Sequence, residues 1–330
     1  MKLATDSEIE IDPQILALPG VGPSTAKKLS DSGFHSIESI AVAAIGEISA
    51  VADIGEKTAQ KIVDAARGAL NFSYEWASQV DDRRMNLDRI TTCSRTLDEV
   101  LGGGIETGSL TEFFGEFRTG KTQLVHQLAV AVQLPKEEGG VEGAALWIDT
   151  EGTFRTERVK AMAAKSGLDE KEVLDSILVM DVFNSDHQMV VAEQGPSDFK
   201  RLAQEADLDK DLRLIVVDSL TSYFRAEYIG RGMLAPRQQK LNKHVHTLLK
   251  HAKSLNIAVV VTNQVMAKPE MMFGDPTAPI GGHVVAHAVQ TRIYLRKSKG
   301  QHRIARVVDS PHLAEAEAVF KITADGIDDI

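Results

Sequence analysis

The pattern of apolar and polar positions divides the chain into a helical beginning and a longer alternating remainder. Beyond Met85, short β-branched runs alternate with longer stretches in which apolar residues recur at helical spacing. The runs are SLTEFF, AALWID, ILVMDV, LRLIVVD and IAVVVTN, and each precedes or follows an amphipathic stretch. This alternation is typical of an α/β fold in which helices cover both faces of a mainly parallel sheet.

The pattern changes near the C-terminus, where two strand-like runs follow each other without a helix between them. TRIYLR and HRIARVVD flank the polar turn KSKGQ. This arrangement predicts a hairpin or meander that closes the sheet.

The first 70 residues contain an internal repeat. LPGVGPSTAKKL at 18–29 matches VADIGEKTAQKI at 51–62, and each copy places a glycine, Gly22 or Gly55, just before an amphipathic helix. This is the arrangement of a helix-hairpin-helix unit, whose tight turn leaves helix N-terminal amides free to hold a DNA phosphate. A helical bundle that uses glycine only for close packing is the alternative. We predict a small all-α helix-hairpin-helix domain over 1–70, a linker over 71–84 and an α/β core over 85–330.

Composition and charge limit the kinds of protein that the chain can be. With 43% hydrophobic and 25% charged residues it has the composition of a globular protein with room for about two domains. The formal net charge of -10 argues against coating nucleic acid by global electrostatics, so DNA contact would have to be local. The N-terminus is acidic, and no run approaches the roughly 18 apolar residues that span a bilayer, so we expect a soluble, unexported protein. Cys93 is the only cysteine, which excludes an internal disulfide and suits a reducing compartment; we expect it to be buried.

A phosphate-binding loop is the most specific motif of the chain. Residues 115–122 read GEFRTGKT, a full match to GxxxxGK[ST] between an apolar strand and a helix that begins near Lys121. The glycines let successive amides point at the β-phosphate, Lys121 would reach the β- and γ-oxygens, and the Thr122 hydroxyl would bind Mg²⁺. We therefore predict that ATP is bound by Gly115, Glu116, Phe117, Arg118, Thr119, Gly120, Lys121, Thr122 and Gln123.

Two acidic positions at strand ends complete the predicted ATPase site. Asp218 ends the apolar run LIVV, where a carboxylate would hold a magnesium-bound water; an N-cap of the following segment is the alternative. Glu151, just beyond the run AALWID, is the candidate that orients or deprotonates the attacking water. Asp149 is closer to the strand interior, and we expect it to brace the loop instead.

Two further side chains are candidates for contact with the nucleotide. The planar guanidinium of Arg158 would stack on adenine, unless it is simply an exposed helix arginine. Gln264, at the end of IAVVVTN, would hydrogen-bond the γ-phosphate and report the nucleotide state to the loop that follows.

Two segments leave the predicted sheet at the same edge as Asp218 and Gln264. The segment 225–243 is basic and contains Tyr228, which suits single-stranded DNA, although a solvated helix start has the same composition. Pro236 suits the first position of a helix there. The segment 265–282 is rich in glycine, proline and methionine, and an apolar side chain could insert beside unstacked bases. The predicted DNA-binding residues are Arg225, Tyr228, Arg231, Arg237, Lys268 and Phe273.

Taken together, the motifs resemble the archaeal and eukaryotic branch of the RecA recombinase family, of the RadA type. The resemblance covers essentially the whole chain and is carried by GEFRTGKTQ, IDTEGTFR, LIVVDS, FRAEY, RQQKLNKH, VTNQVMA, GDPTAPIGGH and RVVDSPHL. It implies a RecA-like P-loop core, with ATP and Mg²⁺ between adjacent subunits of a homo-oligomeric filament. It also implies that Lys121, Glu151 and Gln264 serve hydrolysis, and that His287 and Asp309 approach from the next subunit. The partners it implies are single-stranded DNA, homologous double-stranded DNA and mediator or loader proteins, in the cytoplasm or nucleoid of an archaeon or the nucleus of a eukaryote.

Two departures from the family pattern concern assembly and nucleotide binding. The polymerisation motif of the family is Phe-x-x-Ala, and the best-placed match here begins with Tyr74 and ends with Ala77, unless Phe72 is the anchor in a shifted register. Tyrosine in an apolar pocket needs a partner for its hydroxyl. Ala314 stands where relatives have a proline that packs over adenine, so nucleotide capping is expected to be looser.

These features favour an ATP-dependent recombinase that pairs a DNA-bound filament with homologous duplex. A RecA-fold hexameric helicase would share the P-loop but would unwind DNA directionally. A recombination mediator paralogue would bind DNA without exchanging strands, and the presence of Glu151, Gln264, both DNA-facing segments and the N-terminal domain argues against it.

Overall fold

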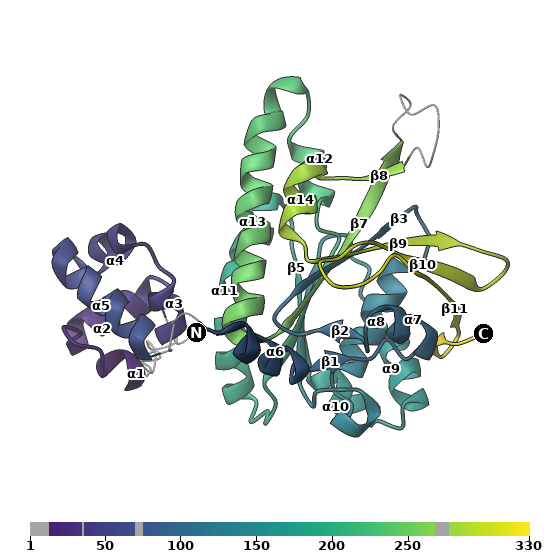
Figure 1. The fold of residues 1–330 in the computed structure, drawn as a ribbon, viewed down its shortest axis with the longest axis horizontal. Coiled ribbons are helices and arrows are strands. Elements are labelled where there is room, and N and C mark those ends of the chain that lie inside the picture. The colour runs from purple at the N-terminus through teal and green to yellow at the C-terminus, as the bar shows by residue number, and fades with distance from the viewer. Residues whose placement is uncertain (1–12, 35, 70–74, 268–276) are drawn as a thin grey trace, which may run out of the picture. The chain divides into compact units, whose positions relative to one another are not determined.

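The structure, a computed structural model, describes residues 13–34, 36–69, 75–267 and 277–330. It separates into two compact units, one up to Met85 and one from Asn86 to Ile330, and each is described by itself. Figure 1 shows the small helical unit and the larger unit built around a sheet.

Five helices pack around one apolar centre in the N-terminal unit: α1 (Pro13–Leu16), α2 (Pro23–Asp31), α3 (Ile37–Ala41), α4 (Ile45–Ala52) and α5 (Glu56–Ala69). Leu29, Ile40, Ile48 and Ile62 are fully buried in this centre. The two repeated segments form α2 and α5, which begin directly after Gly22 and Gly55. This confirms the helical pair predicted from the internal repeat.

The expected linker is helical in its second half. Helix α6 (Ala77–Met85) contains no buried residue, and the Trp76 N–H donates to Gln79 Oε1 at 2.8 Å, which caps the helix start. Trp76 is 80% exposed, while Arg83 pairs with Glu75 at 2.9 Å. Ala77 therefore lies at a helix start; Tyr74 and Phe72 lie outside the described residues.

The larger unit is built on a mixed sheet whose central strands run parallel. From one edge to the other the order is β12-β11-β10-β9-β3-β7-β6-β4-β5, with β8 paired to β7. The strands are β3 (Leu110–Gly115), β4 (Ala144–Asp149), β5 (Ile177–Asp181), β6 (Leu212–Asp218), β7 (Ala258–Ala267), β8 (Thr277–Pro279), β9 (Thr291–Lys297), β10 (His302–Asp309), β11 (Glu317–Thr323) and β12 (Gly326–Asp328), beside the small pair β1 (Arg89–Ile90) and β2 (Ile105–Glu106). Strands β9, β3, β7, β6, β4 and β5 pair in parallel with one another in that order, while β8 pairs antiparallel with β7.

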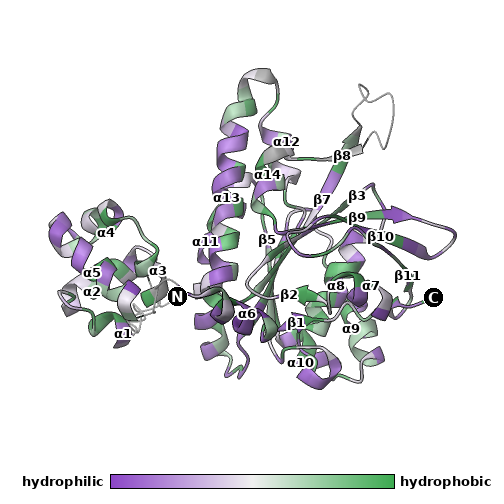
Figure 2. Cartoon of the chain, viewed as in Figure 1, coloured by the Kyte–Doolittle hydropathy of each residue, from purple (hydrophilic) through white to green (hydrophobic). Residues whose placement is uncertain are grey.

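Helices cover both faces of this sheet, as predicted. One apolar cluster contains side chains of α7 (Arg95–Val100), α8 (Lys121–Ala131), α9 (Thr156–Lys165) and α10 (Glu170–Asp175). The other contains side chains of α11 (Ser185–Glu205), α12 (Ser222–Glu227), α13 (Leu234–Leu255) and α14 (Gly282–Ala288). Figure 2 shows the apolar strands in the middle of the unit and polar residues on the outer sides of α11 and α13. Because both faces are covered, the central strands are mostly apolar along their whole length.

The C-terminal hairpin is also confirmed. β9 and β10 pair antiparallel, and β10, β11 and β12 continue as antiparallel neighbours. Cys93 is half-buried instead of buried, because its left-handed backbone (φ 64°) lies in a loop where Gln127 Nε2 donates to its sulfur at 3.2 Å. Among the described residues, no helix is both long and apolar enough to span a membrane.

Candidate nucleotide and DNA site

The carboxyl ends of four parallel strands meet at one edge of the sheet. Gly115 at the end of β3 pairs in register with Gln264 on β7, and Asp149 at the end of β4 pairs with Asp218 at the end of β6. Ligand sites of parallel α/β sheets form at this edge. The sheet therefore brings together residues that the sequence analysis took from separate motifs.

The loop between β3 and α8 depends on glycine at two positions, by close backbone approach at Gly115 and by backbone conformation at Gly120. A Cβ at Gly115 would lie 2.2 Å from the Leu295 carbonyl oxygen, and one at Gly120 would lie 2.3 Å from Ile322 Cδ1. Gly120 also has a left-handed backbone (φ 101°) directly before α8. A helix N-terminus that follows such a curled, glycine-dependent loop is suited to bind phosphate.

Lys121, the first residue of α8, is folded back over this loop. Its Nζ donates to the carbonyl oxygens of Gly115 at 3.0 Å and Glu116 at 2.8 Å. Burial lowers the pKa of Lys121, while the charges of Asp218 and Glu151 act to raise it. An ammonium group that lies over the loop and donates to its backbone carbonyls is placed to bind an anion such as a triphosphate.

The outer loop residues differ in exposure. Phe117 is 80% exposed, and the guanidinium of Arg118 lies 5.4 Å from the centre of its ring. Thr119 is buried and its hydroxyl donates to the Glu116 carbonyl at 2.9 Å, which ties the loop to itself.

Asp218 is held firmly at the end of β6. Its carboxylate accepts hydrogen bonds from the hydroxyls of Thr153, at 2.9 Å, and Thr262, and only 3% of the residue is exposed. It is not the N-cap of the next helix, because α12 begins at Ser222 with Thr221 in the capping position.

The donors at this edge fit Mg²⁺ only as part of a nucleotide complex. The described residues contain no cluster of three or more His, Cys, Asp or Glu side chains suited to a metal. Mg²⁺ commonly takes one or two protein oxygens and completes its six ligands with phosphate and water. Thr122 and Asp218 are the protein oxygens that would serve in that way.

Glu151 and Gln264 are in direct contact although they come from different loops. Gln264 Nε2 donates to Glu151 Oε1 at 2.9 Å. Burial and the neighbouring Asp218 raise the pKa of Glu151, whereas the Gln264 bond and Lys121 act to lower it. A carboxylate with a raised pKa beside a phosphate-binding loop is suited to accept a proton from water.

Asp149 braces the glutamate loop, as the sequence analysis expected. Its carboxylate accepts from the backbone N–H groups of Glu151, at 3.1 Å, and Phe154, at 2.9 Å. Both carboxylate oxygens are therefore used in fixing the loop, which leaves Glu151 as the acid that faces the site.

His126 on α8 also positions this loop, a role that no motif of the sequence predicted. Its Nε2 accepts from the Arg155 N–H at 3.0 Å and its Nδ1 lies 2.7 Å from the Thr122 carbonyl oxygen, which fixes the neutral tautomer with the proton on Nδ1. Burial lowers the pKa of His126. The ring packs against Trp147 and Phe154. A histidine four residues after Thr122 on a buried helix was the only signal for this role in the sequence.

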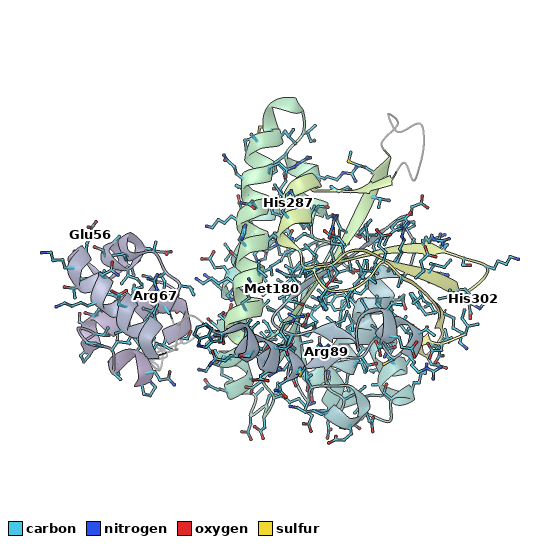
Figure 3. The ribbon with its side chains drawn as sticks, in the orientation of Figure 1. Glu56, Arg67, Arg89, Met180, His287 and His302 are labelled. Atoms are coloured by element: carbon cyan, nitrogen blue, oxygen red, sulfur yellow. The ribbon has the colours of Figure 1, made fainter. Side chains whose placement is uncertain are left out.

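The other predicted nucleotide residues lie apart from this edge or are held elsewhere. Arg158 donates to the carbonyl of Ala324 and, at 3.2 Å, to that of Thr323, so its guanidinium binds the turn between β11 and β12. His287, labelled in Figure 3, is exposed on α14, and Asp309 is exposed at the end of β10. Exposure suits the expectation that these two act on a neighbouring subunit.

The predicted DNA-facing segment 225–243 is mostly helical, which agrees with the helix start expected near Pro236 but adds helical turns before it. Arg225 lies in α12, a short 3-10 turn (Arg231–Met233) follows, and α13 begins at Leu234, ahead of Pro236. Helix formation starts earlier than proline predicts because Pro is tolerated anywhere in the first turn, where its missing N–H is not needed.

The side chains of this segment are partly engaged with each other. Lys240 Nζ lies 5.5 Å from the centre of the Tyr228 ring and 2.5 Å from Asp186 Oδ1. Arg225 is exposed and Arg237 is half-buried. Lys268, Phe273 and the side chain of Arg231 lie outside the described residues.

Comparisons with known proteins agree with this arrangement. A family model described as Rad51 matches residues 83–330, and one described as a SAM-like helix-hairpin-helix tandem matches residues 13–67. The chain is 52% identical over 315 residues to the DNA repair and recombination protein RadA of Aeropyrum pernix, with 96% of each chain covered. It is 51% identical over 312 residues to the RadA protein of Metallosphaera sedula, with 94% of each covered.

Proposed function

Because the chain belongs to the Rad51 family, we propose that it is an ATP-dependent recombinase that forms helical filaments on single-stranded DNA and catalyses homologous pairing and strand exchange in recombinational repair. The observation that carries this proposal is the contact between Glu151 and Gln264 at the sheet edge from which both DNA-facing segments leave. It connects the group that would activate water with the strand that leads into the segment 265–282.

In the proposed ATPase, each side chain at this edge of the sheet has its own role. Lys121 and the loop amides bind the β- and γ-phosphates, while Thr122 and Asp218 hold Mg²⁺, directly or through water. Bound Mg²⁺ would neutralise charge on the phosphates. Glu151 orients water and accepts its proton, and Asp149 and His126 fix the loop that carries Glu151.

Nucleotide binding acts chiefly as a clamp in this proposal. The guanidinium of Arg158, while its N–H groups donate to Thr323 and Ala324, stacks its face on adenine. His287 and Asp309 reach the nucleotide of the neighbouring subunit, so that ATP stiffens the interface between subunits. Tyr74 and Ala77 supply the contact that joins one subunit to the next. Hydrolysis then weakens the interface and releases DNA, because a ligand stabilises whichever state binds it more tightly.

DNA is held by local contacts, since the net charge of the chain is -10. Arg225, Arg231, Arg237 and Lys268 contact phosphates, and Tyr228 and Phe273 pack against bases or sugars. Base pairing between strands supplies the sequence recognition. Mediator or loader proteins are the further partners in this proposal, and the archaeal origin of the two relatives supports a location in the cytoplasm or nucleoid.

Joint-molecule formation tests this proposal directly. The purified protein, incubated with ATP, Mg²⁺, a single-stranded circle and a homologous linear duplex, should yield joint molecules only when the sequences match. A helicase would instead displace a strand from a forked duplex in one direction without homology. Absence of joint molecules under every nucleotide condition would favour a mediator protein and would refute the proposal.

A further inference from the structure

A fully buried asparagine links four segments of the core unit. Asn263 on β7 is 0% exposed, and its Oδ1 accepts from the Thr221 hydroxyl at 2.7 Å and from the Gln264 N–H at 2.9 Å. Its Nδ2 donates to the Ile280 carbonyl at 2.6 Å and to Glu112 Oε1 at 2.7 Å. A side-chain amide has two donor hydrogens and two acceptor lone pairs, so the hydrogen-bonding capacity of Asn263 is fully used.

A buried ion pair holds the amide in this orientation. Glu112 on β3 is 0% exposed, and its Oε2 accepts from Arg292 Nε on β9 at 2.7 Å. Burial raises the pKa of Glu112, while Arg292 and the bond from Asn263 act to lower it. The Arg292 guanidinium also lies 5.3 Å from the centre of the Phe114 ring. Rotation of the Asn263 amide would place its oxygen against Glu112, so the carboxylate fixes which way the amide points.

Two partners of Asn263 lie close to the DNA-facing segments, Thr221 shortly before the first and Ile280 within the second. Thr221 stands in the N-cap position of α12, which opens the segment 225–243. Ile280 lies near the end of the segment 265–282, and its own N–H donates to the Gln264 carbonyl at 3.0 Å. Gln264 in turn contacts Glu151. A displacement of Gln264 would therefore be transmitted to both segments through the side chain of Asn263.

We propose that Asn263 is the positioning residue that couples both DNA-facing segments to the nucleotide site, with the Glu112–Arg292 pair as its anchor. This inference rests on the proposed function, because it assigns a route for the coupling between ATP and DNA. All donor and acceptor positions of the Asn263 amide are occupied, so its hydrogen bonds have only one arrangement. A shift of β7 would therefore move Thr221 and Ile280 together.

The strand pairing extends the same path toward the predicted subunit interface. Arg292 pairs in register with Asp309 at the end of β10. Asp309 is the residue expected to reach the nucleotide of the neighbouring subunit. The anchor of the network thus lies on the strand next to Asp309.

The test compares the affinity for DNA with and without nucleotide in matched variants. Thr221→Val removes the hydroxyl that contacts Asn263, Thr221→Ser retains it, and Asn263→Ala removes the amide. Gln133→Ala is the control, because Gln133 is also a buried amide that donates to two carbonyls, those of Ala129 and Val173, but it contacts neither segment. The affinity for a fluorescent oligo-thymidine is measured with Mg²⁺, in the presence and absence of a slowly hydrolysed ATP analogue.

We expect the ratio of the two affinities to fall about fivefold or more in Thr221→Val and Asn263→Ala, and to stay at the wild-type value in Thr221→Ser and Gln133→Ala. The affinity for a fluorescent ATP analogue without DNA should be the same in all five proteins. A merely structural role would weaken folding without changing the ratio.

Three results would overturn the inference: an unchanged ratio in Thr221→Val, an equal loss in Thr221→Ser, or an equal loss in Gln133→Ala. If Asn263→Ala does not fold, as judged by circular dichroism, the two Thr221 variants decide. A wild-type protein whose DNA affinity does not depend on nucleotide would refute the proposed function itself, before any variant is compared.

Discussion

A buried and a half-buried histidine on α13, His244 and His251, should make the core unit sensitive to acid. His244 is 1% exposed, packs against Phe224 with 5.8 Å between ring centres, and lies 3.1 Å from Gln188 Nε2. Burial lowers the pKa of His244 to about 4. It lowers the pKa of His251 to about 4 as well, and the charge of Lys250 adds to the effect.

The sign and size of the effect follow from linkage. A histidine in the unfolded chain has a pKa near 6.5. Below that pH the two histidines bind protons in the unfolded chain but remain neutral in the folded chain. The stability that these neutral rings contribute is complete above pH 6.5 and is lost as the pH falls toward about 4. At pH 5 each ring should lower the free energy of unfolding by about 2 kcal/mol relative to pH 8, or about 4 kcal/mol together. That is a large part of the roughly 5–15 kcal/mol that stabilises a typical domain.

The assay is urea unfolding at pH 8 and pH 5, followed by the fluorescence of Trp147, which is buried in the core unit. The double variant His244→Phe with His251→Leu keeps the apolar packing and removes both titrating groups. Burial raises the pKa of Glu112, so Glu112 makes the folded protein more stable as the pH falls, opposite to the histidines. The quantity compared is therefore the loss of stability between pH 8 and pH 5 in the wild type and in the variant, since Glu112 affects both equally. If the variant loses as much free energy of unfolding as the wild type between pH 8 and pH 5, the two histidines are not the cause of the acid sensitivity.

Three further predictions concern the proposed site. Lys121→Ala should abolish ATP-dependent filaments, seen by electron microscopy, because the cation that reaches the phosphates is gone; filaments of normal length would contradict this. Glu151→Gln should retain ATP binding but slow hydrolysis by about 10²–10⁴-fold in a phosphate-release assay, and a rate within tenfold of wild type would assign the role to another group. Arg231→Ala should weaken DNA binding and reduce the slope of log affinity against log salt by about one, measured by fluorescence anisotropy, whereas an unchanged slope would remove Arg231 from the phosphate contacts.

The sequence predicted the features that depend on local chemistry. The P-loop follows from one continuous motif, and the meeting of Asp218 and Gln264 follows from their positions at the ends of apolar strands, since parallel strands end at a common edge. The hairpin of β9 and β10 was likewise visible in two runs around a polar turn.

The sequence did not reveal the contacts that depend on distant pairings. Asn263 and Glu112 are 151 positions apart, and Arg292 and Glu112 are 180 apart, so no local pattern marks them as partners. In the segment 225–243 only Pro236 indicated a helix start. The structure also places Arg225 in α12 and starts α13 at Leu234, and Phe224 and Leu241 of these two helices are buried in the core. Local propensity is a weak guide where buried side chains decide the conformation.

Electron microscopy of the protein with single-stranded DNA tests the central claim, that bound ATP assembles subunits around DNA. With Mg²⁺ and a slowly hydrolysed ATP analogue, the protein should form regular helical filaments that cover the DNA, and these should be missing without nucleotide. Particles that remain monomeric, or filaments that form equally well in the absence of nucleotide, would contradict it.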